Sequence, residues 1–349
     1  MVGQQASGKT NLMASVLFNT NAAVDLAEGP DRIGSPSISV RPVGDALSPD
    51  ARTLQTHYDQ MLFGRTTPGT DDVRRYEATL RYVDAPQPSG RVGFRRAPVE
   101  EPVELEFDIV DGRGGDVAKT RQFAGEENEE EARDNKAKLD RYRDGLNDSI
   151  GAVICMPIRK DEFDSVVVTN FNAELELMRQ RKAKDPQLPR LSRVAICFTM
   201  YELEFLSEGG GAIDRAVRPE VFRERMMDNA NLSMFKPFVL GNRGPDAFDI
   251  RFFPTSSYGF VSEGGSPNYY DYAGARGLKA RAVDPVEDYG DIALPGYKDH
   301  FPIPLSQGEA SALWFPFNVA PPILFALTGR ITGPVSLAPH ELGFAAEPA

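Results

Sequence analysis

Eight residues near the start of the chain have the types and spacing of a loop that binds nucleotide phosphates. The stretch GQQASGKT, residues 3–10, fits the pattern G-x-x-x-x-G-K-[ST]. Glycines allow backbone N–H groups to turn toward phosphate oxygens, and the N-terminus of a following helix adds partial positive charge. A chance Gly-Lys-Thr turn at the surface is the alternative. The residues that we expect to contact a nucleotide are Gly3, Ser7, Gly8, Lys9, Thr10 and Asn11.

Within this set, two side chains have distinct expected roles. Lys9 would reach the β and γ phosphates, and the Thr10 hydroxyl would bind Mg²⁺.

The loop should follow a buried strand and open a helix. Residues 11–18 have the apolar spacing of a helix, but only two residues precede the loop. A missing central strand would leave backbone groups unpaired, each costing about 1–3 kcal/mol when buried. We therefore expect the natural protein to begin upstream, with about five or six apolar residues ending at Val2.

A carboxylate further along the chain could complete the metal site. Residues 75–83 and 103–110 alternate apolar and polar side chains and are predicted to form a hairpin with a long loop. The second run leads into Asp111-Gly112-Arg113-Gly114. Asp111 could hold Mg²⁺ directly or through water, and the Gly114 N–H could approach the γ-phosphate. An ordinary strand that ends in an Asp-Gly turn is the alternative.

A threonine before the first of these strands is a third candidate ligand. In nucleotide-dependent switches, a loop threonine binds Mg²⁺ and the γ-phosphate, so that the loop orders only in the triphosphate state. Thr70 is our choice within Thr67-Pro68-Gly69-Thr70, and Thr67 is the second choice. A turn without any ligand is the alternative.

Composition excludes several classes of function. The chain has 349 residues, of which 41% are hydrophobic and 26% charged, as in an ordinary globular protein. Its net charge of −12 argues against general binding to nucleic acid or anionic membranes. Cys155 and Cys197 lie in apolar runs typical of buried thiols, and there is no signal peptide or membrane span, so we expect a cytoplasmic setting. His57, His300 and His340 lack metal-ligand spacing and are expected at the surface.

Strand and helix patterns alternate along the chain, which predicts an α/β fold with a mostly parallel sheet and helices on both faces. Buried strands are expected at 152–158, 193–199 and 249–254, and helices near 51–63, 126–146, 170–182 and 219–240. The Gly- and Pro-rich stretch 262–308 indicates an insertion or a mobile loop. Residues 313–327 are predicted to form a closing helix. The expected units are a P-loop domain over 1–261, an insertion over 262–312 and a C-terminal helix and tail over 313–349.

The order of these parts resembles the small GTPase fold of the translation-factor-related class of P-loop proteins. The resemblance covers residues 1–261. Within that class, the Pro-Gly-Thr turn at 68–70 and the closing segment WFPFNVAPPILFAL, residues 314–327, resemble the bacterial double-GTPase group, whose members are encoded with partner proteins in conflict or defence systems. The resemblance implies a P-loop fold, GTP or GDP with Mg²⁺ as cofactors, and a protein partner encoded nearby. Because only two residues precede the loop, we expect the first strand of this fold to be truncated in this sequence.

The resemblance also assigns residues that read the base. The class identifies guanine with N/T-K-x-D after the fifth strand, where this chain has Thr199-Met200-Tyr201-Glu202. Thr199 takes the Asn/Thr position and Glu202 the Asp position, whereas Met200 replaces the lysine. Ser256 and Ser257 take the first two positions of the S-A-K motif after the sixth strand. A strand-terminating turn at these serines is the alternative.

Hydrolysis is expected to be slow or stimulated by a partner. Many small GTPases place a glutamine after D-x-x-G to orient the attacking water, but Gly115 follows Gly114 here. Arg113, Asp116 and Arg121 lie nearby, and none occupies the position of the missing group, so no catalytic residue is assigned. Two other classes stay open, namely a P-loop ATPase or kinase and a pseudo-GTPase scaffold that does not depend on nucleotide.

Overall fold

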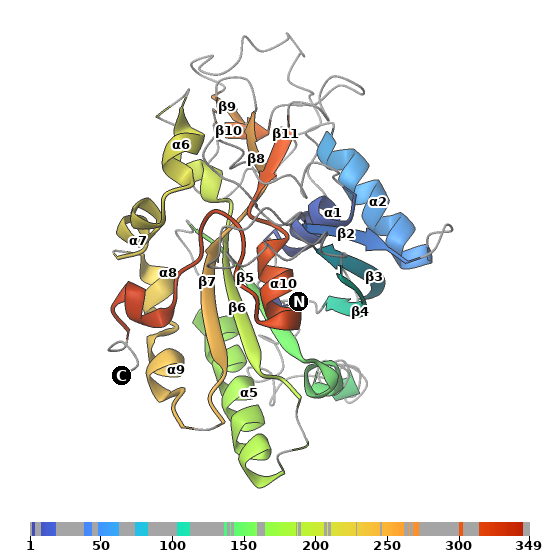
Figure 1. The fold of residues 1–349 in the computed structure, drawn as a ribbon, viewed down its shortest axis with the longest axis vertical. Helices are drawn as coiled ribbons and strands as arrows, with labels where there is room; N and C mark the ends of the chain where they lie inside the picture. The colour runs from blue at the N-terminus through green and yellow to red at the C-terminus, as the bar shows by residue number, and fades with distance from the viewer. Residues whose placement is uncertain are drawn as a thin grey trace, which may run out of the picture.

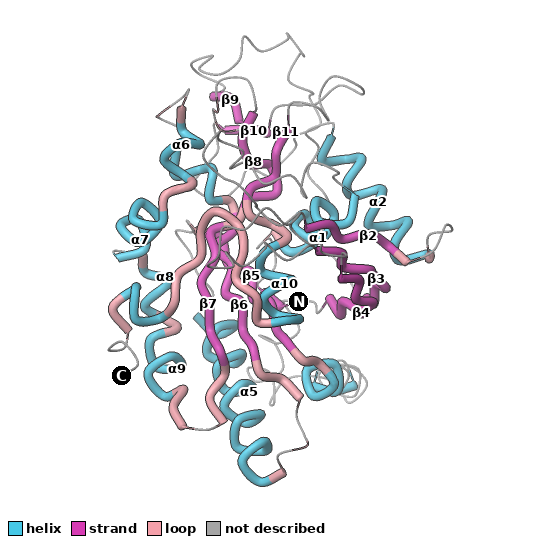
Figure 2. The backbone as a smooth tube through the Cα atoms, in the orientation of Figure 1, coloured by secondary structure: helices cyan, strands magenta, loops and turns pink. Residues whose placement is uncertain are grey.

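The structure is a computed structural model of the 349-residue chain. The chain folds as an α/β protein in which helices surround a parallel sheet (Figures 1 and 2). The described residues are 2–3, 8–18, 38–43, 48–62, 74–82, 103–111, 136–137, 140, 143–158, 165–185, 187, 190–205, 208, 211–227, 229–244, 246–261, 265, 267, 269–271, 300–302 and 314–344.

A four-stranded parallel sheet forms the centre of the described structure. Strands β5 (Gly151–Pro157) and β6 (Arg193–Thr199) pair over their full lengths, and β7 (Asp249–Pro254) pairs with the other side of β6. The short strand β1 (Val2–Gly3) pairs with the middle of β5, so the order is β1-β5-β6-β7. The three longer strands are almost continuously apolar because both faces of the sheet are covered. The three strands predicted over 152–254 are confirmed.

The first face of this sheet packs against a long helix and several short ones. Ile154, Ile196 and Phe252 on this face share one core with apolar side chains of the helices. The helices are α5 (Ser165–Lys184), α7 (Pro219–Met227), α8 (Ala230–Ser233) and α9 (Lys236–Gly241).

The helical structure predicted near 219–240 is confirmed, and the described residues there form three helices. A new helix begins after Asn229, whose side chain accepts a hydrogen bond from the Leu232 N–H at 3.3 Å, as a capping residue does. Pro237 then sits in the first turn of α9, where proline is tolerated but cannot continue a preceding helix.

The second face of the sheet packs against α1 (Lys9–Phe18) and α10 (Pro321–Thr328). The rings of Phe253 on β7 and Phe325 on α10 lie 5.8 Å apart. Cys155 and Cys197 face this side and are fully buried, as predicted, and burial raises the pKa of the Cys197 thiol. The same core continues into the second sheet (Figure 1).

The second sheet is antiparallel, with the order β2-β3-β4. Strands β3 (Arg74–Tyr82) and β4 (Val103–Asp111) form the predicted hairpin, paired from Tyr82 with Val103 to Arg74 with Asp111. Helix α2 (Pro49–Leu62) contributes to the same core, as predicted for 51–63. Strand β2 (Ile38–Pro42) was not predicted, because the surrounding residues 29–70 are rich in Gly, Pro, Ser and Thr.

Strand β11 (Trp314–Phe317) replaces the first part of the predicted closing helix. It pairs antiparallel with β8 (Ser256–Val261), and the helix begins only at Pro321. A pair of prolines is compatible with a first helical turn and not with a helix interior, so helix α10 cannot extend back through them. The remaining elements are β9 (Tyr269–Asp271), β10 (His300–Pro302), η2 (Tyr201–Phe205), α6 (Ala212–Ala216) and η3 (Pro339–Leu342).

Two predicted regions fall largely outside the described residues. Within the predicted insertion 262–312, the described residues include the pair β9 and β10, which run antiparallel. Within the predicted charged helix 126–146, residues 136–137, 140 and 143–146 are helical where described. Among the helices that the structure describes, none combines the length and the apolar character needed to cross a bilayer.

The prediction that His57 lies at the surface is wrong. His57 has an exposed fraction of only 6%. It lies on α2 three residues after Leu54 and four before Met61, so helical spacing places it on the apolar face. Burial, and secondarily the positive charge of Arg74, lowers the pKa of His57 from its ordinary 6.5. His340 is half-buried, and the side chain of His300 lies outside the described residues.

The lowered pKa of His57 predicts a specific acid sensitivity. The folded state binds a proton on His57 more weakly than the unfolded state does. The contribution of neutral His57 to the free energy of unfolding should therefore be complete above about pH 6.5 and should be lost as the pH falls below that value. We expect a His57→Gln variant, which has no such proton, to lose less of its free energy of unfolding between pH 7.5 and pH 5.5. Equal losses in urea titrations of the two proteins would show that His57 does not contribute.

Candidate functional site

The Gly-Lys-Thr end of the phosphate-loop motif opens helix α1. Strand β1 ends at Gly3, α1 begins at Lys9, and the Leu12 N–H donates to the Gly8 carbonyl at 2.8 Å. Gly8 has a φ of +76°, in the left-handed region that glycine adopts without steric cost. The order strand, loop, helix that the motif requires is present around these residues.

Gly8 lies against the end of β6. A Cβ atom placed on Gly8 would sit 3.7 Å from Cβ of Thr199 and 3.9 Å from Cε of Met200. Met200 has a φ of +61°, which ends the strand and turns the chain into η2. Ligands of open parallel sheets bind outside the carboxyl ends of the strands, and this is the end at which Gly8, Thr199 and Met200 meet.

Buried polar side chains concentrate at the same end of the sheet. Among the described residues, every buried polar or charged side chain except His57 and Glu174 belongs to α1, to the last residue of β6, or to the segments that follow β6, β7 and β11. Burying polar groups costs free energy, so their concentration here marks this edge as the strongest candidate site. The residues are Lys9, Ser15, Thr199, Glu202, Thr255, Ser256, Ser257 and Asn318.

Thr199 ties together the ends of two strands. Its Oγ1 donates to the Met156 carbonyl of β5 at 3.0 Å, and its own carbonyl accepts from the Ile158 N–H at 2.9 Å. The predicted base-reading threonine thus aligns the carboxyl ends of β5 and β6, directly beside Gly8.

Glu202 lies on η2, and its exposed fraction is 0%. Glutamate is rarely fully buried in proteins, and this one lies at the edge where the other buried polar side chains concentrate, so it is a candidate site residue. Pairing of Glu202 with guanine requires the carboxylate to become reachable from the ligand.

Comparison with models of known protein families found no match, and neither did comparison with curated proteins. The arrangement of residues at the carboxyl edge therefore carries the functional argument.

Ser256 and Ser257 lie in strand β8 and not in a loop. The Ser256 Oγ accepts a hydrogen bond from the Gly259 N–H at 2.5 Å, which is the local turn-type contact left open as the alternative. The Ser257 carbonyl accepts from Ser15 Oγ of α1 at 3.3 Å. Ser257 therefore attaches β8 to the helix that the phosphate loop opens, whereas the Ser256 contact stays within β8.

The structure describes only some of the candidate metal ligands. Thr10 is half-buried in the first turn of α1, and Asp111 is the last residue of β4, with its side chain outside the described residues. Ser7, Thr70 and Gly114 also lie outside them. Within the described chain, no group of three His, Cys, Asp or Glu side chains could hold a metal. The expected donors, two hydroxyls and a carboxylate, supply the oxygen atoms that Mg²⁺ prefers.

Thr255 is a polar site residue that the sequence analysis missed. Its N–H donates to the Phe198 carbonyl at 2.8 Å, and its carbonyl accepts from the Tyr201 N–H at 3.1 Å. Its hydroxyl is fully buried and has no hydrogen-bond partner among the described residues. The available signal was a polar residue directly after the apolar run of β7. Ser15 was missed because only packing against β8 shows its contact.

We expect Thr255→Val to raise the free energy of unfolding of the nucleotide-free protein by about 1 kcal/mol, because it removes a buried hydroxyl without a partner. Thr199→Val is the matched control with the opposite sign. It breaks the bond to the Met156 carbonyl and should lower stability by about 1 kcal/mol. Urea unfolding of both variants checks this, and a destabilised Thr255→Val would contradict it.

Proposed function

We propose that the chain binds a guanine nucleoside triphosphate together with Mg²⁺ at the carboxyl edge of the parallel sheet and acts as a nucleotide-dependent switch or assembly subunit. The observation that carries this proposal is the position of Gly8, Lys9 and Thr10. They open α1, and Gly8 lies directly against the end of β6, where the buried polar residues concentrate. Backbone N–H groups at such a helix start favour a phosphate.

The first turn of α1 would bind the phosphate groups of the ligand. Lys9 has an exposed fraction of 7%, so its ammonium group would act on phosphate oxygens with little screening by water. Bound Mg²⁺ would supply charge neutralisation on the phosphates. Thr10 is the candidate ligand from α1, and Asp111 and Thr70 are the candidates from elsewhere in the chain.

Glu202 is the reason for proposing guanine over adenine. Guanine presents a ring N–H and an exocyclic amine side by side, and a carboxylate accepts from both, whereas adenine does not offer this pair. Glu202 is the second residue of η2 and comes two residues after Met200, whose side chain lies by Gly8. The base site is therefore proposed next to the phosphate site.

The proposed cycle depends on a partner for turnover. Gly115 stands where many small GTPases carry the glutamine that orients water, so intrinsic hydrolysis should be slow. A protein partner, encoded nearby as in the double-GTPase group, would supply the missing group or read the nucleotide state. We propose a cytoplasmic location for this complex.

Identification of the nucleotide that co-purifies with the protein tests the proposal. The chain is denatured after purification in Mg²⁺, and the released small molecules are identified by mass spectrometry. GTP or GDP is the expected result. ATP or ADP would favour a P-loop ATPase or kinase, and failure to retain or bind any nucleotide would favour a scaffold.

A further inference from the structure

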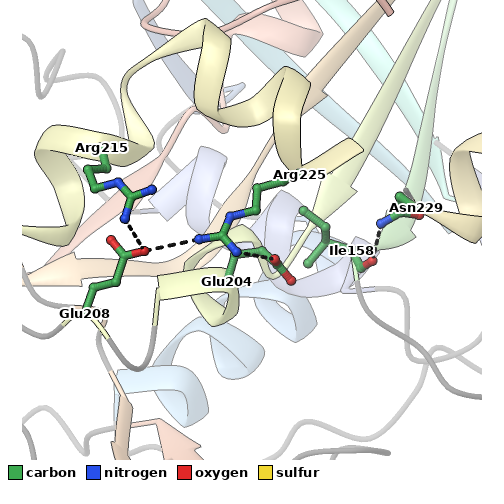
Figure 3. A network of polar contacts seen from close by, with 6 residues as sticks. All are labelled: Ile158, Glu204, Glu208, Arg215, Arg225 and Asn229. Carbon is green, nitrogen blue, oxygen red and sulfur yellow. Dashed lines mark hydrogen bonds and ion pairs between the residues drawn. The ribbon is translucent and has the colours of Figure 1, made fainter. Parts of the chain in front are cut away.

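Arg225 of α7 sits between two carboxylates that follow the candidate base-reading residue. Its Nη1 lies 3.8 Å from Glu204 Oε2, and its Nη2 donates to Glu208 Oε1 at 3.2 Å. Glu208 also accepts from Arg215 of α6 at 2.8 Å. Figure 3 shows Arg225 bridging the two glutamates. The cluster of Arg215, Arg225, Glu204 and Glu208 is called the Arg225 clamp below.

The Arg225 clamp holds η2, the short helix that carries Glu202. Glu204 belongs to η2, and its side chain is only 9% exposed. The guanidinium carbon of Arg225 also lies 5.8 Å from the centre of the Phe205 ring, at the last position of η2. A cation beside an aromatic face adds attraction to the ion pairs. Both charge and ring contacts therefore fix η2 against α7.

The other end of η2 is fixed at the candidate site. The Tyr201 N–H donates to the Thr255 carbonyl, and Met200 immediately before it lies beside Gly8. Glu202 thus stands on a segment of a few residues held at one end by the sheet edge and at the other by Arg225. A short segment fixed at both ends has a backbone with little freedom to shift relative to the loop.

A second contact runs to the same edge from Asn229, the residue directly before α8. The Asn229 side chain donates to the Ile158 carbonyl at 2.8 Å (Figure 3). The Ile158 N–H in turn donates to the Thr199 carbonyl. The segment α7–α8 is therefore attached both to the strand end beside Gly8 and to η2. The helix that carries Arg225 is thus itself held in place at the sheet edge.

We propose that Arg225 is a positioning residue for base selectivity: it holds η2 beside the phosphate loop, so that the Glu202 carboxylate, buried in this structure, can pair with a guanine base once the ligand reaches it. The proposal rests on the proposed function. Loss of Arg225 removes the cation that joins Glu204 to Glu208 and the contact with the Phe205 ring, while Arg215 still pairs with Glu208. Glu204 and η2 are then no longer tied to α7 through Arg225, and η2 shifts while the phosphate loop keeps its own contacts.

The test measures GTP, ATP and inorganic tripolyphosphate binding by calorimetry in Mg²⁺ for the full chain and three variants. Arg225→Met keeps much of the aliphatic side chain without the charge, and Arg225→Lys restores one cation. Arg223→Met is the matched control, since Arg223 lies on the same helix with an exposed side chain. Circular dichroism confirms that each variant is folded.

We expect Arg225→Met to weaken GTP binding about tenfold, the size of effect that residues in one network commonly transmit. Affinity for tripolyphosphate and for ATP should stay within about twofold, because neither depends on pairing with Glu202. Arg225→Lys should recover part of the GTP affinity, and Arg223→Met should match the unmodified chain. A merely structural role would lower all three affinities together.

Two results overturn the inference and are distinguishable. If the unmodified chain selects GTP and folded Arg225→Met keeps the same GTP-to-ATP ratio, the inference alone fails. If the unmodified chain binds neither nucleotide nor tripolyphosphate, the proposed function fails and the inference fails with it.

Should Arg225→Met not fold, Glu208→Gln replaces it in the same assay, since it weakens the Arg225 clamp while leaving both arginines. It should lower the GTP-to-ATP ratio, and an unchanged ratio overturns the inference.

Discussion

Replacing Lys9 with alanine is expected to weaken the binding of Mg²⁺ and GTP at least tenfold, a loss of about 1.4 kcal/mol or more. Lys9 is the first residue of α1, and its exposed fraction is only 7%. A charge-assisted contact from a shielded ammonium group to phosphate is stronger than one at the surface. Calorimetric titration with GTP measures the change.

Lys236→Ala is the control for this experiment, because Lys236 is an exposed lysine in the first turn of another helix. It should bind GTP as the unmodified chain does. Circular dichroism establishes that Lys9→Ala is folded. Unchanged GTP affinity in folded Lys9→Ala would remove the phosphate-loop assignment.

Replacing Glu202 with alanine is expected to erase any preference for GTP over ATP. Its carboxylate is the proposed acceptor for both guanine donors, and a ligand whose donors are left unpaired in a buried site loses affinity. We expect GTP binding to weaken by about tenfold or more and ATP binding to change little. Competition titrations of the two nucleotides give the ratio directly.

Glu220→Ala is a matched control, since Glu220 lies in the exposed first turn of α7. A second variant, Glu202→Gln, keeps the shape of the side chain and removes one acceptor. It should also lower the ratio. A preserved GTP preference in folded Glu202→Ala would assign base recognition to another residue.

The parallel strands could be predicted because their pattern is local. Strands β5, β6 and β7 are short apolar runs between helical segments, and the hairpin of β3 and β4 alternates cleanly. Strand β2 and strand β11 were missed because their pairing partners, and not their composition, make them strands. Element type in such short runs depends on tertiary contacts.

The candidate site could be predicted where its residues are consecutive in sequence. Gly8, Lys9 and Thr10 come from one motif, and Thr199 and Glu202 come from the resemblance to a known motif. Thr255 was missed because its importance follows from burial without a hydrogen-bond partner, which no spacing shows. The same limit applies to Arg225, whose contacts with Glu204 and Glu208 join separate elements.

Titration of the purified chain with GTP in the presence of Mg²⁺ tests the central claim most directly. Calorimetry should show saturable binding at one site per chain, weaker binding when EDTA removes Mg²⁺, and weaker binding of ATP. No saturable binding of GTP or ATP up to about 1 mM, a concentration that detects affinities near −4 kcal/mol, would contradict the claim that the carboxyl edge of this sheet is a nucleotide site.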